Sequence, residues 1–215
     1  MERLTEKAYT QVWNERYGQE GFAYGKGPNV FFKEWITQLE PGKILLPADG
    51  EGRNGVFAAQ IGWETTATDL SPEGKEKALQ LANELGTSLT YLVGDLEHMS
   101  FPKEHFDAIV LIYAHFLPEK KSLLHRKLDT FLRPGGTLIL EAFGKNHLPY
   151  KKANPAVGGP GDLEMLYSVA ELKEDFPGYK VRMLMETEVS LSEGAYHKGK
   201  GSVVRFVGAK PLTVS

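Results

Sequence analysis

The sequence contains no cysteine. Disulfide bonds, thiolate metal sites and a cysteine nucleophile are therefore excluded, and the chain suits a reducing compartment. Long apolar runs are also missing, since the longest, Ala108 to Ala114, is far shorter than the ~20 residues of a membrane-spanning helix. The opening residues, MERLTEKAYTQVW, have no apolar segment of the kind found in signal peptides. We therefore expect a soluble, cytoplasmic protein with no membrane partner.

The sequence also lacks a strong excess of one charge. The 25 basic and 28 acidic residues are mixed along the chain, the formal net charge is −3, and no long basic run is available to follow a phosphate backbone. We therefore expect no nucleic-acid partner. The six histidines show no metal-ligand spacing, so we expect no metal. With 215 residues and 41% apolar content, the chain fits one domain, as a monomer or a homodimer.

The segment Lys43 to Asp69 has the pattern of a nucleotide pocket at the tip of a parallel sheet. An apolar strand is followed by Gly50, Gly52 and Gly55, which let the backbone turn tightly and approach a ligand. A short helix comes next, and a second strand ends at Asp69, whose carboxylate can accept hydrogen bonds from ribose hydroxyls. This segment alone allows a nicotinamide dinucleotide and another adenosine-containing cofactor equally well.

Strands and helices alternate regularly from Lys43 onward. Strands are predicted at residues 43–47, 65–69, 89–93, 106–113, 137–143, 179–189 and 203–210, and helices at 53–61, 72–85, 118–132 and 169–176. This order predicts an α/β fold with a doubly wound, mostly parallel seven-stranded sheet that ends in an antiparallel hairpin. We divide the single domain, 1–215, into a helical lid region at 1–40, a cofactor-binding core at 43–143, and a substrate-side loop, helix and hairpin at 144–215.

The glycine loop, Asp69, Gly94-Asp95-Leu96 after the third strand, LRPGG before the fifth strand and the final hairpin resemble the class I S-adenosylmethionine-dependent methyltransferases. The resemblance covers residues 10 to 210 and implies a Rossmann-like fold, S-adenosyl-L-methionine as cofactor and methyltransferase activity. The segments GEGRN and SEGAYHKG also resemble the small tellurite-resistance and thiopurine methyltransferases. These relatives imply a small soluble acceptor with a soft or anionic nucleophile.

The resemblance also implies which residues hold the cofactor. They lie where strands end: the backbone of Ala48, Gly50 and Gly52 for the methionine part, Asp69 for the ribose, Leu70, Asp95 and Leu96 for the adenine, and Ile112, Tyr113 and Ala114 for the floor below the methyl group.

The first motif departs from the family, because relatives have an acid at the position of Leu46 and a glycine at that of Ala48. We expect Asp49 to replace the missing acid by holding the cofactor ammonium, directly or through water. Asn54 either caps the following helix or binds the cofactor carboxylate or the lid. Tyr24 is expected to pack on the sulfonium side of the pocket.

Three residues are candidates for acting on the acceptor. His197, within SEGAYHKG, can take a proton or, when charged, hold an anion; its alternative is an ordinary exposed loop histidine. His115 follows the fourth strand and either faces substrate or caps the strand through backbone hydrogen bonds. Arg205 is expected to orient the acceptor together with His197.

Two alternatives remain open. Gly50-x-Gly52-x-x-Gly55 also fits a dinucleotide fingerprint, and Tyr196-x-x-x-Lys200 has the spacing used by short-chain NAD(P)-dependent oxidoreductases. That tyrosine and lysine need a helix to share a face, however, and the glycines around them argue against one. A non-catalytic S-adenosylmethionine-binding protein is the second alternative.

Overall fold

The computed structural model describes residues 6–212 of the chain. They share one seven-stranded sheet with the order β3-β2-β1-β4-β5-β7-β6. The strands are β1 (Lys43–Pro47), β2 (Glu64–Asp69), β3 (Thr90–Val93), β4 (Phe106–Ile112), β5 (Leu132–Phe143), β6 (Lys180–Glu193) and β7 (His197–Ala209). β1 to β5 are parallel, and β7 is antiparallel to both β5 and β6. The predicted fold class, including the closing hairpin, is confirmed.

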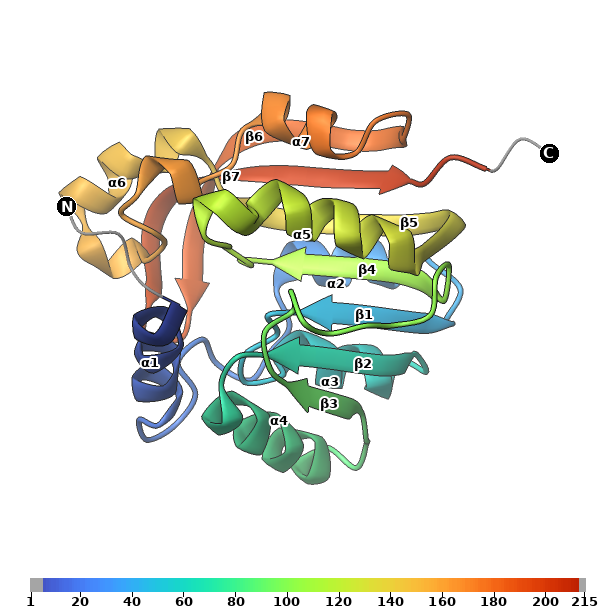
Figure 1. Cartoon of the computed structure of the whole chain (residues 1–215). Coiled ribbons are helices and arrows are strands. Elements are labelled where there is room, and N and C mark those ends of the chain that lie inside the picture. The colour runs from blue at the N-terminus through green and yellow to red at the C-terminus, as the bar shows by residue number, and fades with distance from the viewer. Residues whose placement is uncertain (1–5, 213–215) are drawn as a thin grey trace.

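Helices cover both faces of this sheet (Figure 1). They are α1 (Glu6–Tyr17), α2 (Val30–Ile36), α3 (Arg53–Gln60), α4 (Pro72–Glu84), α5 (Pro118–Phe131), α6 (Leu148–Ala153) and α7 (Val169–Asp175). Three 3-10 turns lie at Lys145–His147, Pro155–Val157 and Leu163–Met165. None of the helices within residues 6–212 has the length and apolar character that a bilayer crossing requires.

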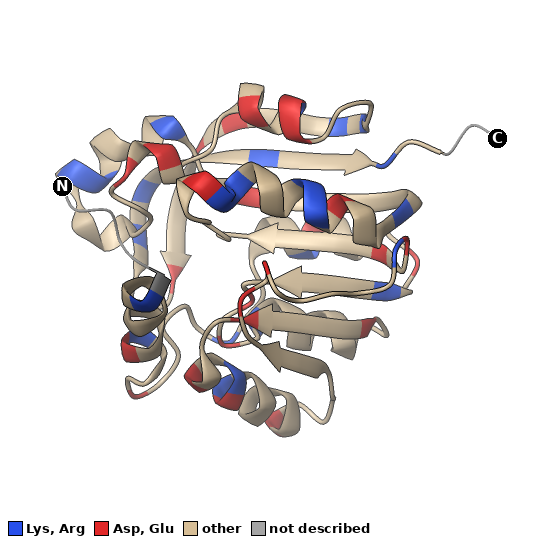
Figure 2. Cartoon of the chain, viewed as in Figure 1, with Lys and Arg blue, Asp and Glu red and all other residues tan. Residues whose placement is uncertain are grey.

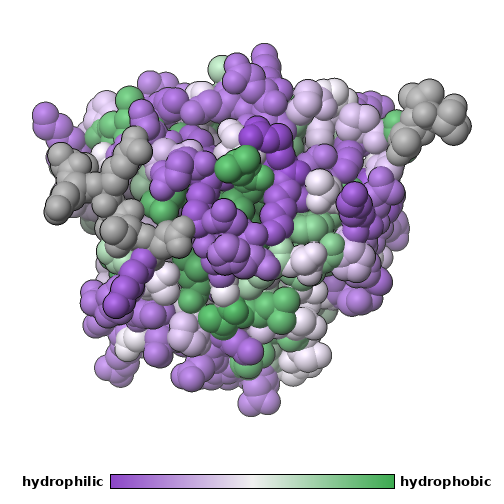
Figure 3. Space-filling view, viewed as in Figure 1, coloured by the Kyte–Doolittle hydropathy of each residue, from purple (hydrophilic) through white to green (hydrophobic). Residues whose placement is uncertain are grey.

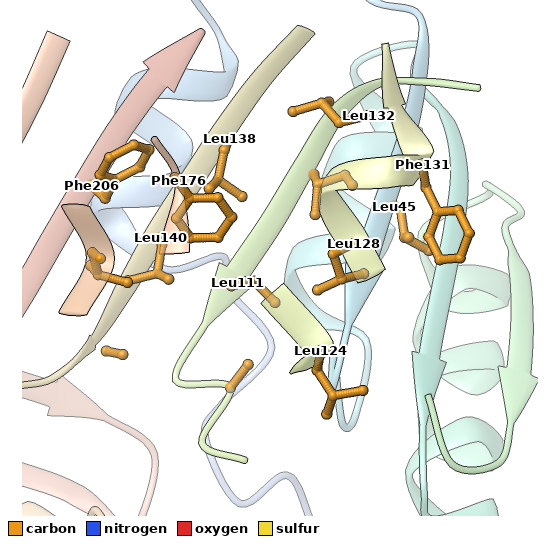
Figure 4. Close-up of a cluster of buried hydrophobic side chains, with 14 of the residues drawn as sticks. Leu45, Leu111, Leu124, Leu128, Phe131, Leu132, Leu138, Leu140, Phe176 and Phe206 are labelled. Carbon is orange, nitrogen blue, oxygen red and sulfur yellow. The ribbon is translucent and has the colours of Figure 1, made fainter. Parts of the chain in front are cut away.

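Each face of the sheet has its own apolar core. On one face, Leu124, Leu128 and Phe131 of α5 pack with Leu45 and Leu111 of the strands (Figure 4). On the other face, α2, α3 and α4 supply a second buried cluster. Two covered faces are what a parallel sheet requires, because its strands are apolar on both sides. Figure 3 shows that hydrophilic side chains occupy most of the surface in this view, with apolar side chains in separate patches.

The helix boundaries follow the capping signals in the sequence. The Ser71 hydroxyl accepts a hydrogen bond from the Gly74 N–H at 3.2 Å, and Pro72 occupies the first turn of α4. Ser168 caps α7 in the same way, by accepting from the Glu171 N–H. Asn29 caps α2 by accepting from the Phe32 N–H at 2.9 Å. These local contacts explain why most of the predicted helix ends agree with the structure to within one or two residues.

The final hairpin is longer than predicted. β6 continues to Glu193 and β7 begins at His197, so the expected loop SEGAYHKGKGS is mostly strand and the turn is only residues 194–196. The glycines in this segment mark close approach rather than a break. A Cβ atom at Gly201 would lie 3.0 Å from the Leu191 side chain, and one at Gly199 would lie 2.7 Å from the Asn154 side chain.

The segment 144–161 also differs from the prediction of a loop without regular structure. It contains α6 and two 3-10 turns, and the buried Val157 side chain anchors it. Figure 1 shows α6 and the outer half of the β6–β7 hairpin turning across the end of the sheet, with α1 below them. The carboxyl ends of β1, β2 and β4 point toward this enclosure, which is where α/β sheets bind their ligands.

Candidate active site

A cavity of about 500 Å³ lies at the carboxyl ends of the parallel strands. Its volume falls within the roughly 300–1,000 Å³ typical of small-molecule sites. The strand tips form its floor, and its walls come from α1, the loop after α1, α6 and the hairpin turn. Of the predicted site residues, those that line it are Tyr24, Ala48, Asp49, Gly50, Asn54, Asp69, Leu70, Asp95, Leu96, Ile112, Tyr113, His115 and His197.

The backbone at the end of β1 turns sharply through left-handed conformations. Ala48 has φ 54° and Gly50 has φ 56°. A Cβ atom at Gly50 would lie 2.4 Å from the Tyr17 hydroxyl oxygen, so only glycine fits there. Ala48 is strained because L-residues other than glycine rarely adopt this conformation. A glycine, which the family resemblance implies at this position, would remove the strain.

Asp69 lies beside this turn at the end of β2. Its two carboxylate oxygens accept hydrogen bonds from the Gly50 N–H at 3.0 Å and the Ser71 N–H at 2.9 Å. Burial raises its pKa to about 6. The carboxylate is fixed by backbone donors and lines the cavity, as a ribose-binding acid must.

Asp49 is a second acid in the same wall and is partly buried. Its Oδ2 accepts a hydrogen bond from the Gly55 N–H at 3.0 Å, and burial together with the nearby charge of Asp69 raises its pKa to about 8. Two neighbouring buried carboxylates destabilise each other's charged forms. A cationic ligand group would reduce this repulsion. The two carboxylates therefore fit a cofactor that carries ammonium and sulfonium charges.

The opposite end of the cavity is lined by Leu70, Asp95 and Leu96. One Asp95 oxygen lies 3.0 Å from the Lys120 ammonium nitrogen and the other accepts from the Glu97 N–H. Although partial burial would raise the pKa of Asp95, these two hydrogen bonds hold it below its ordinary value. The three residues predicted to contact the adenine therefore lie together in the cavity lining. Asp95 and Glu97 also approach His98, but with both carboxylates paired to Lys120 we assign no metal site to this exposed group.

Two predicted cofactor residues lie outside the cavity lining, which corrects the prediction. Gly52 is the N-cap of α3 with φ 81°, and a Cβ atom there would lie 2.4 Å from that of Ala78, so this glycine serves helix packing. Ala114 is buried, and its carbonyl accepts a hydrogen bond from Tyr167. Asn54 does line the cavity, and its Oδ1 accepts from the Asn29 N–H at 2.9 Å, which connects α3 to the start of α2.

His197 lies at the acceptor side and is only 3% exposed, so the alternative of an exposed loop histidine is wrong. Its ring contacts those of Tyr24, Tyr113 and Phe143, with centroid distances of 4.6, 4.5 and 5.2 Å. The Nδ1 atom lies 3.0 Å from Glu193 Oε2. Burial lowers the pKa of His197, which favours the neutral ring at neutral pH.

Glu193 fixes the orientation of that ring. It also accepts hydrogen bonds from Arg53 at 3.1 Å and from the Asn29 side chain at 3.1 Å. Burial alone would raise its pKa, but the His197 hydrogen bond and the Arg53 charge lower it to about 2. Glu193 is therefore ionised and accepts the Nδ1 proton, which leaves the lone pair on Nε2. Within residues 6–212, Nε2 has no hydrogen-bond partner.

Arg205 does not join His197, which corrects the prediction that it orients the acceptor. Its Nε donates to Glu141 Oε2 at 2.6 Å, and its guanidinium lies 4.6 Å from the Phe31 ring centroid. Arg205 pairs with Glu141 in the sheet register and its side chain points toward α2, outside the cavity. It balances the charge of a buried glutamate instead.

His115 lines the cavity, but hydrogen bonds to the backbone occupy both of its ring nitrogens. Nδ1 lies 2.9 Å from the Met165 carbonyl, and Nε2 accepts from the Phe143 N–H at 3.2 Å. Burial lowers its pKa to about 3. These contacts agree with the alternative of a strand cap bonded to backbone, and they leave neither ring nitrogen free for an acceptor in this structure.

The helical lid predicted over residues 1–40 is held against the hairpin turn by contacts that the sequence did not reveal. We call residues 6–28 the lid. Its Tyr24 hydroxyl accepts a hydrogen bond from Arg16 at 2.7 Å, and its Ala23 carbonyl accepts from the Ala195 N–H at 2.8 Å in the hairpin turn. The sequence analysis did not predict that Glu193 pairs with His197. Their i,i+4 spacing across a tight turn was the one local signal that could have identified this ion pair.

The tyrosine and lysine of the oxidoreductase pattern are separated in the structure. Tyr196 lies in the hairpin turn and lines the cavity, whereas Lys200 is an exposed residue of β7 that binds Glu188 at 2.9 Å. They share no helix, so the Tyr-x-x-x-Lys match carries no catalytic pair.

Comparisons with known proteins agree with this geometry. Residues 44–136 match the family model described as a methyltransferase domain. The chain is 27% identical over 153 residues to the tRNA N(3)-cytidine methyltransferase METTL2 of Gallus gallus, covering 65% of this chain and 40% of that protein. It is 30% identical over 102 residues to an uncharacterized protein of Mycobacterium tuberculosis, covering 46% of this chain and 37% of that protein. The chain thus spans about two fifths of the length of these relatives.

Three solved structures share the fold. One is a structure that concerns the conversion of a disulfide bond into a thioacetal group during echinomycin biosynthesis. It has TM-score 0.75 and 16% identity, and the match covers 96% of this chain and 94% of that one. TehB from Haemophilus influenzae has TM-score 0.68, 14% identity and coverage of 94% and 66%. Magnesium protoporphyrin IX methyltransferase from Synechocystis, with bound S-adenosylhomocysteine, has TM-score 0.69, 16% identity and coverage of 96% and 100%.

Residues 44–136 thus match a methyltransferase domain, and the described chain has the fold of the class I S-adenosylmethionine-dependent methyltransferases. The resemblance inferred from the sequence is therefore confirmed for the fold and for this domain match.

Proposed function

We propose that the protein transfers a methyl group from S-adenosylmethionine to a small soluble acceptor, and that His197 accepts the acceptor's proton. The observation that carries this proposal is the pairing of the buried His197 with Glu193, which leaves the His197 Nε2 atom without a partner among the described residues, in the same cavity as Asp49 and Asp69. The proposal further assigns the cytoplasm as location, because the chain has no cysteine, and a monomer or homodimer as the working state.

The bound cofactor supplies a methyl group already activated by a positive sulfur. The protein therefore has to align the reactants and exclude water. Asp69 and the backbone of Gly50 would hold the ribose and methionine parts, Asp49 the ammonium group, and Leu70 and Asp95 the adenine. Tyr113, at the tip of β4 with φ 52°, would form the floor beside the methyl group.

His197 completes the proton balance. As the acceptor atom forms its bond to the methyl carbon, the electron pair of the broken bond stays on the departing sulfur. The proton of a neutral acceptor moves to His197 Nε2, and the negative Glu193 stabilises the imidazolium that forms. An acceptor that is already an anion needs no base, and a soft nucleophile such as a thiolate belongs to that class. Glu193 acts through His197 and is a positioning residue.

The enclosed site favours a small acceptor. The lid and the 144–161 segment cover a cavity of about 500 Å³ that must also hold the cofactor. Figure 2 shows basic and acidic residues interspersed over the molecule, without one continuous basic surface in this view. The relative that methylates tRNA makes an RNA acceptor the alternative that an experiment must include.

The function is tested in two stages. Thermal stabilisation is first measured with S-adenosylmethionine, S-adenosylhomocysteine and NAD(H), and we expect the first two to raise the melting temperature. A shift with NAD(H) alone would overturn the proposal. Methyl transfer is then measured by mass spectrometry over thiols, selenite, tellurite, thiopurines, small carboxylic acids and bulk tRNA.

We expect a product with at least one small acceptor, and a roughly 10²–10⁴-fold lower rate for His197→Ala with neutral acceptors. The affinity of this variant for S-adenosylhomocysteine should stay within a few-fold of wild type. Methylation of tRNA alone would replace the small-acceptor proposal. No product at all, with the cofactor bound, would favour a non-catalytic binding protein.

A further inference from the structure

Two cations without acidic partners face the cavity from opposite walls. Arg16 comes from α1 and Lys151 from α6, and both line the cavity. Figure 2 shows basic residues on both of these helices, which lie at the same end of the molecule. The polar contacts of their charged groups are to the Tyr24 hydroxyl for Arg16 and to the Gly159 carbonyl for Lys151. No carboxylate among residues 6–212 forms an ion pair with either cation.

Two other charged side chains of the cavity lining, Arg53 and Glu51, differ from this pair because each has an ion-pair partner. Arg53 is paired with Glu193 at 3.1 Å, and Glu51 is paired with Lys77 at 3.0 Å. Asp162 caps a 3-10 turn by accepting from the Glu164 N–H. Burial and the positive charge of Arg16 lower the pKa of Lys151, so the two cations disfavour each other's charge until an anion binds between them.

Arg16 is held in the orientation that anion binding needs. Its guanidinium carbon lies 5.0 Å from the Trp13 ring centroid and 4.6 Å from that of Tyr196, so aromatic rings pack against it from the lid and from the hairpin turn. The hydrogen bond to Tyr24 fixes one of its nitrogens. A stacked guanidinium keeps its N–H groups at the edge, where they match the two oxygens of a carboxylate.

The pair also lies next to the proposed base. Tyr24, which binds Arg16, has its ring centroid 4.6 Å from that of His197. Gly158 lies against both His197 and the Tyr196 carbonyl, where a Cβ atom would approach within 2.8 and 2.5 Å. The next residue, Gly159, accepts from Lys151. Asp49 and Asp69, at the cofactor end, repel an anion from that part of the cavity.

We propose that Arg16 and Lys151 form an anion-binding subsite that holds a non-reacting carboxylate of the acceptor, while the acceptor's apolar body lies against Trp13 and Tyr196. The acceptor is therefore a small carboxylic acid with an aromatic or apolar body, and its nucleophilic atom lies beside His197. This inference rests on the proposed function for the role of the site, but its test measures binding alone.

The test uses the full chain saturated with S-adenosylhomocysteine, with binding measured by calorimetry and thermal shift. The probes are benzoate, indole-3-acetate and their uncharged amides. We expect the carboxylates to bind at least tenfold more tightly than the amides. The variants Arg16→Gln and Lys151→Gln should each weaken carboxylate binding at least tenfold, which is a loss of about 1.4 kcal/mol or more, because each removes a charged hydrogen bond. The double variant should remove the preference for carboxylates over amides.

Lys152→Gln is the matched control, because Lys152 is the next residue of α6 and is exposed. It should leave every affinity within twofold of wild type. The cofactor's own carboxylate is the other possible source of the anion. If the double variant loses tenfold in affinity for S-adenosylhomocysteine and keeps its carboxylate preference, the cations serve the cofactor and the inference is wrong.

Carboxylates that bind no better than amides to the wild type would also overturn the inference. Failure of the proposed function has a different signature. In that case the carboxylates bind through Arg16 and Lys151 as expected, but no acceptor is methylated in the screen described above.

Discussion

Ala48 adopts a left-handed backbone conformation that is rare for a residue with a Cβ atom. Its left-handed conformation costs roughly 1–2 kcal/mol for a residue with a Cβ atom. Glycine removes that strain, but its greater conformational freedom in the unfolded state lowers the free energy of unfolding by about 0.5–1 kcal/mol. We therefore predict that Ala48→Gly raises the free energy of unfolding by about 0.5–1 kcal/mol, measured by urea denaturation.

A helical alanine provides the control for this substitution. Ala59 lies within α3, so Ala59→Gly should lower the free energy of unfolding by about 1 kcal/mol. If both substitutions destabilise the protein equally, Ala48 is not strained in solution. Affinity for S-adenosylhomocysteine, measured in parallel, will show whether the alanine also restricts the position of the cofactor.

At the scale of elements, the lid depends on the hairpin turn. Gly194 has φ 57°, and a Cβ atom there would lie 2.3 Å from the Ala23 carbonyl and 2.6 Å from the Tyr24 Cα. We predict that Gly194→Ala displaces the lid and weakens S-adenosylhomocysteine binding at least tenfold, as measured by calorimetry, while the sheet stays folded.

Gly86 supplies the control, because its φ of 66° is similar but a Cβ atom there would meet nothing within 4 Å. Gly86→Ala should lower the melting temperature through backbone strain and leave the affinity for S-adenosylhomocysteine unchanged. Equal affinities for the two variants would mean that the contact between lid and turn does not shape the cofactor site.

The helices and the hairpin show how much of the fold could be predicted from the sequence. The boundaries of α4, α5 and α7 are set by neighbouring residues such as Ser71, Pro118 and Ser168, so local patterns predicted them. The length of the hairpin depends on distant contacts of Gly199 and Gly201 with Asn154 and Leu191, which no local pattern contains.

The site shows the same division between local and distant information. Most of the residues predicted to bind the cofactor line the cavity, because they follow directly after strand ends that the motifs identify. Arg205 was assigned to the wrong place, because the direction of its side chain depends on its partner Glu141 across the sheet. Arg16 and Lys151 were missed because only the folded lid and α6 bring them to one cavity.

For the whole molecule, the two buried acids predict an unusual pH dependence. The pKa of Asp49 is raised from 3.8 to about 8, and that of Asp69 from 3.8 to about 6. Each acid therefore binds more protons in the folded state than in the unfolded state over the pH interval between 3.8 and its raised pKa. Stability of the ligand-free protein should therefore fall as pH rises from about 4 to about 8, by up to ~1.4 kcal/mol per pH unit for each acid.

Cofactor binding should oppose this loss, because the ammonium and sulfonium charges favour the ionised acids. We expect thermal stabilisation by S-adenosylmethionine to be larger at pH 8 than at pH 5.5. Asp49→Asn keeps an acceptor for the Gly55 N–H but cannot ionise, so its stability should depend less on pH between 6 and 8. An unchanged pH profile in this variant would assign the dependence to other groups.

The bond between Asn29 and Glu193 spans 164 residues of sequence. It has a consequence for how the chain is made, because Asn29, directly after the lid, is synthesised well before Glu193, directly before the hairpin turn. At about 5–20 residues per second, the ribosome needs roughly 10–30 s to add the intervening chain. During that time the aromatic residues of the lid have no hairpin to pack against, and the enclosed cavity forms only after the hairpin has been made.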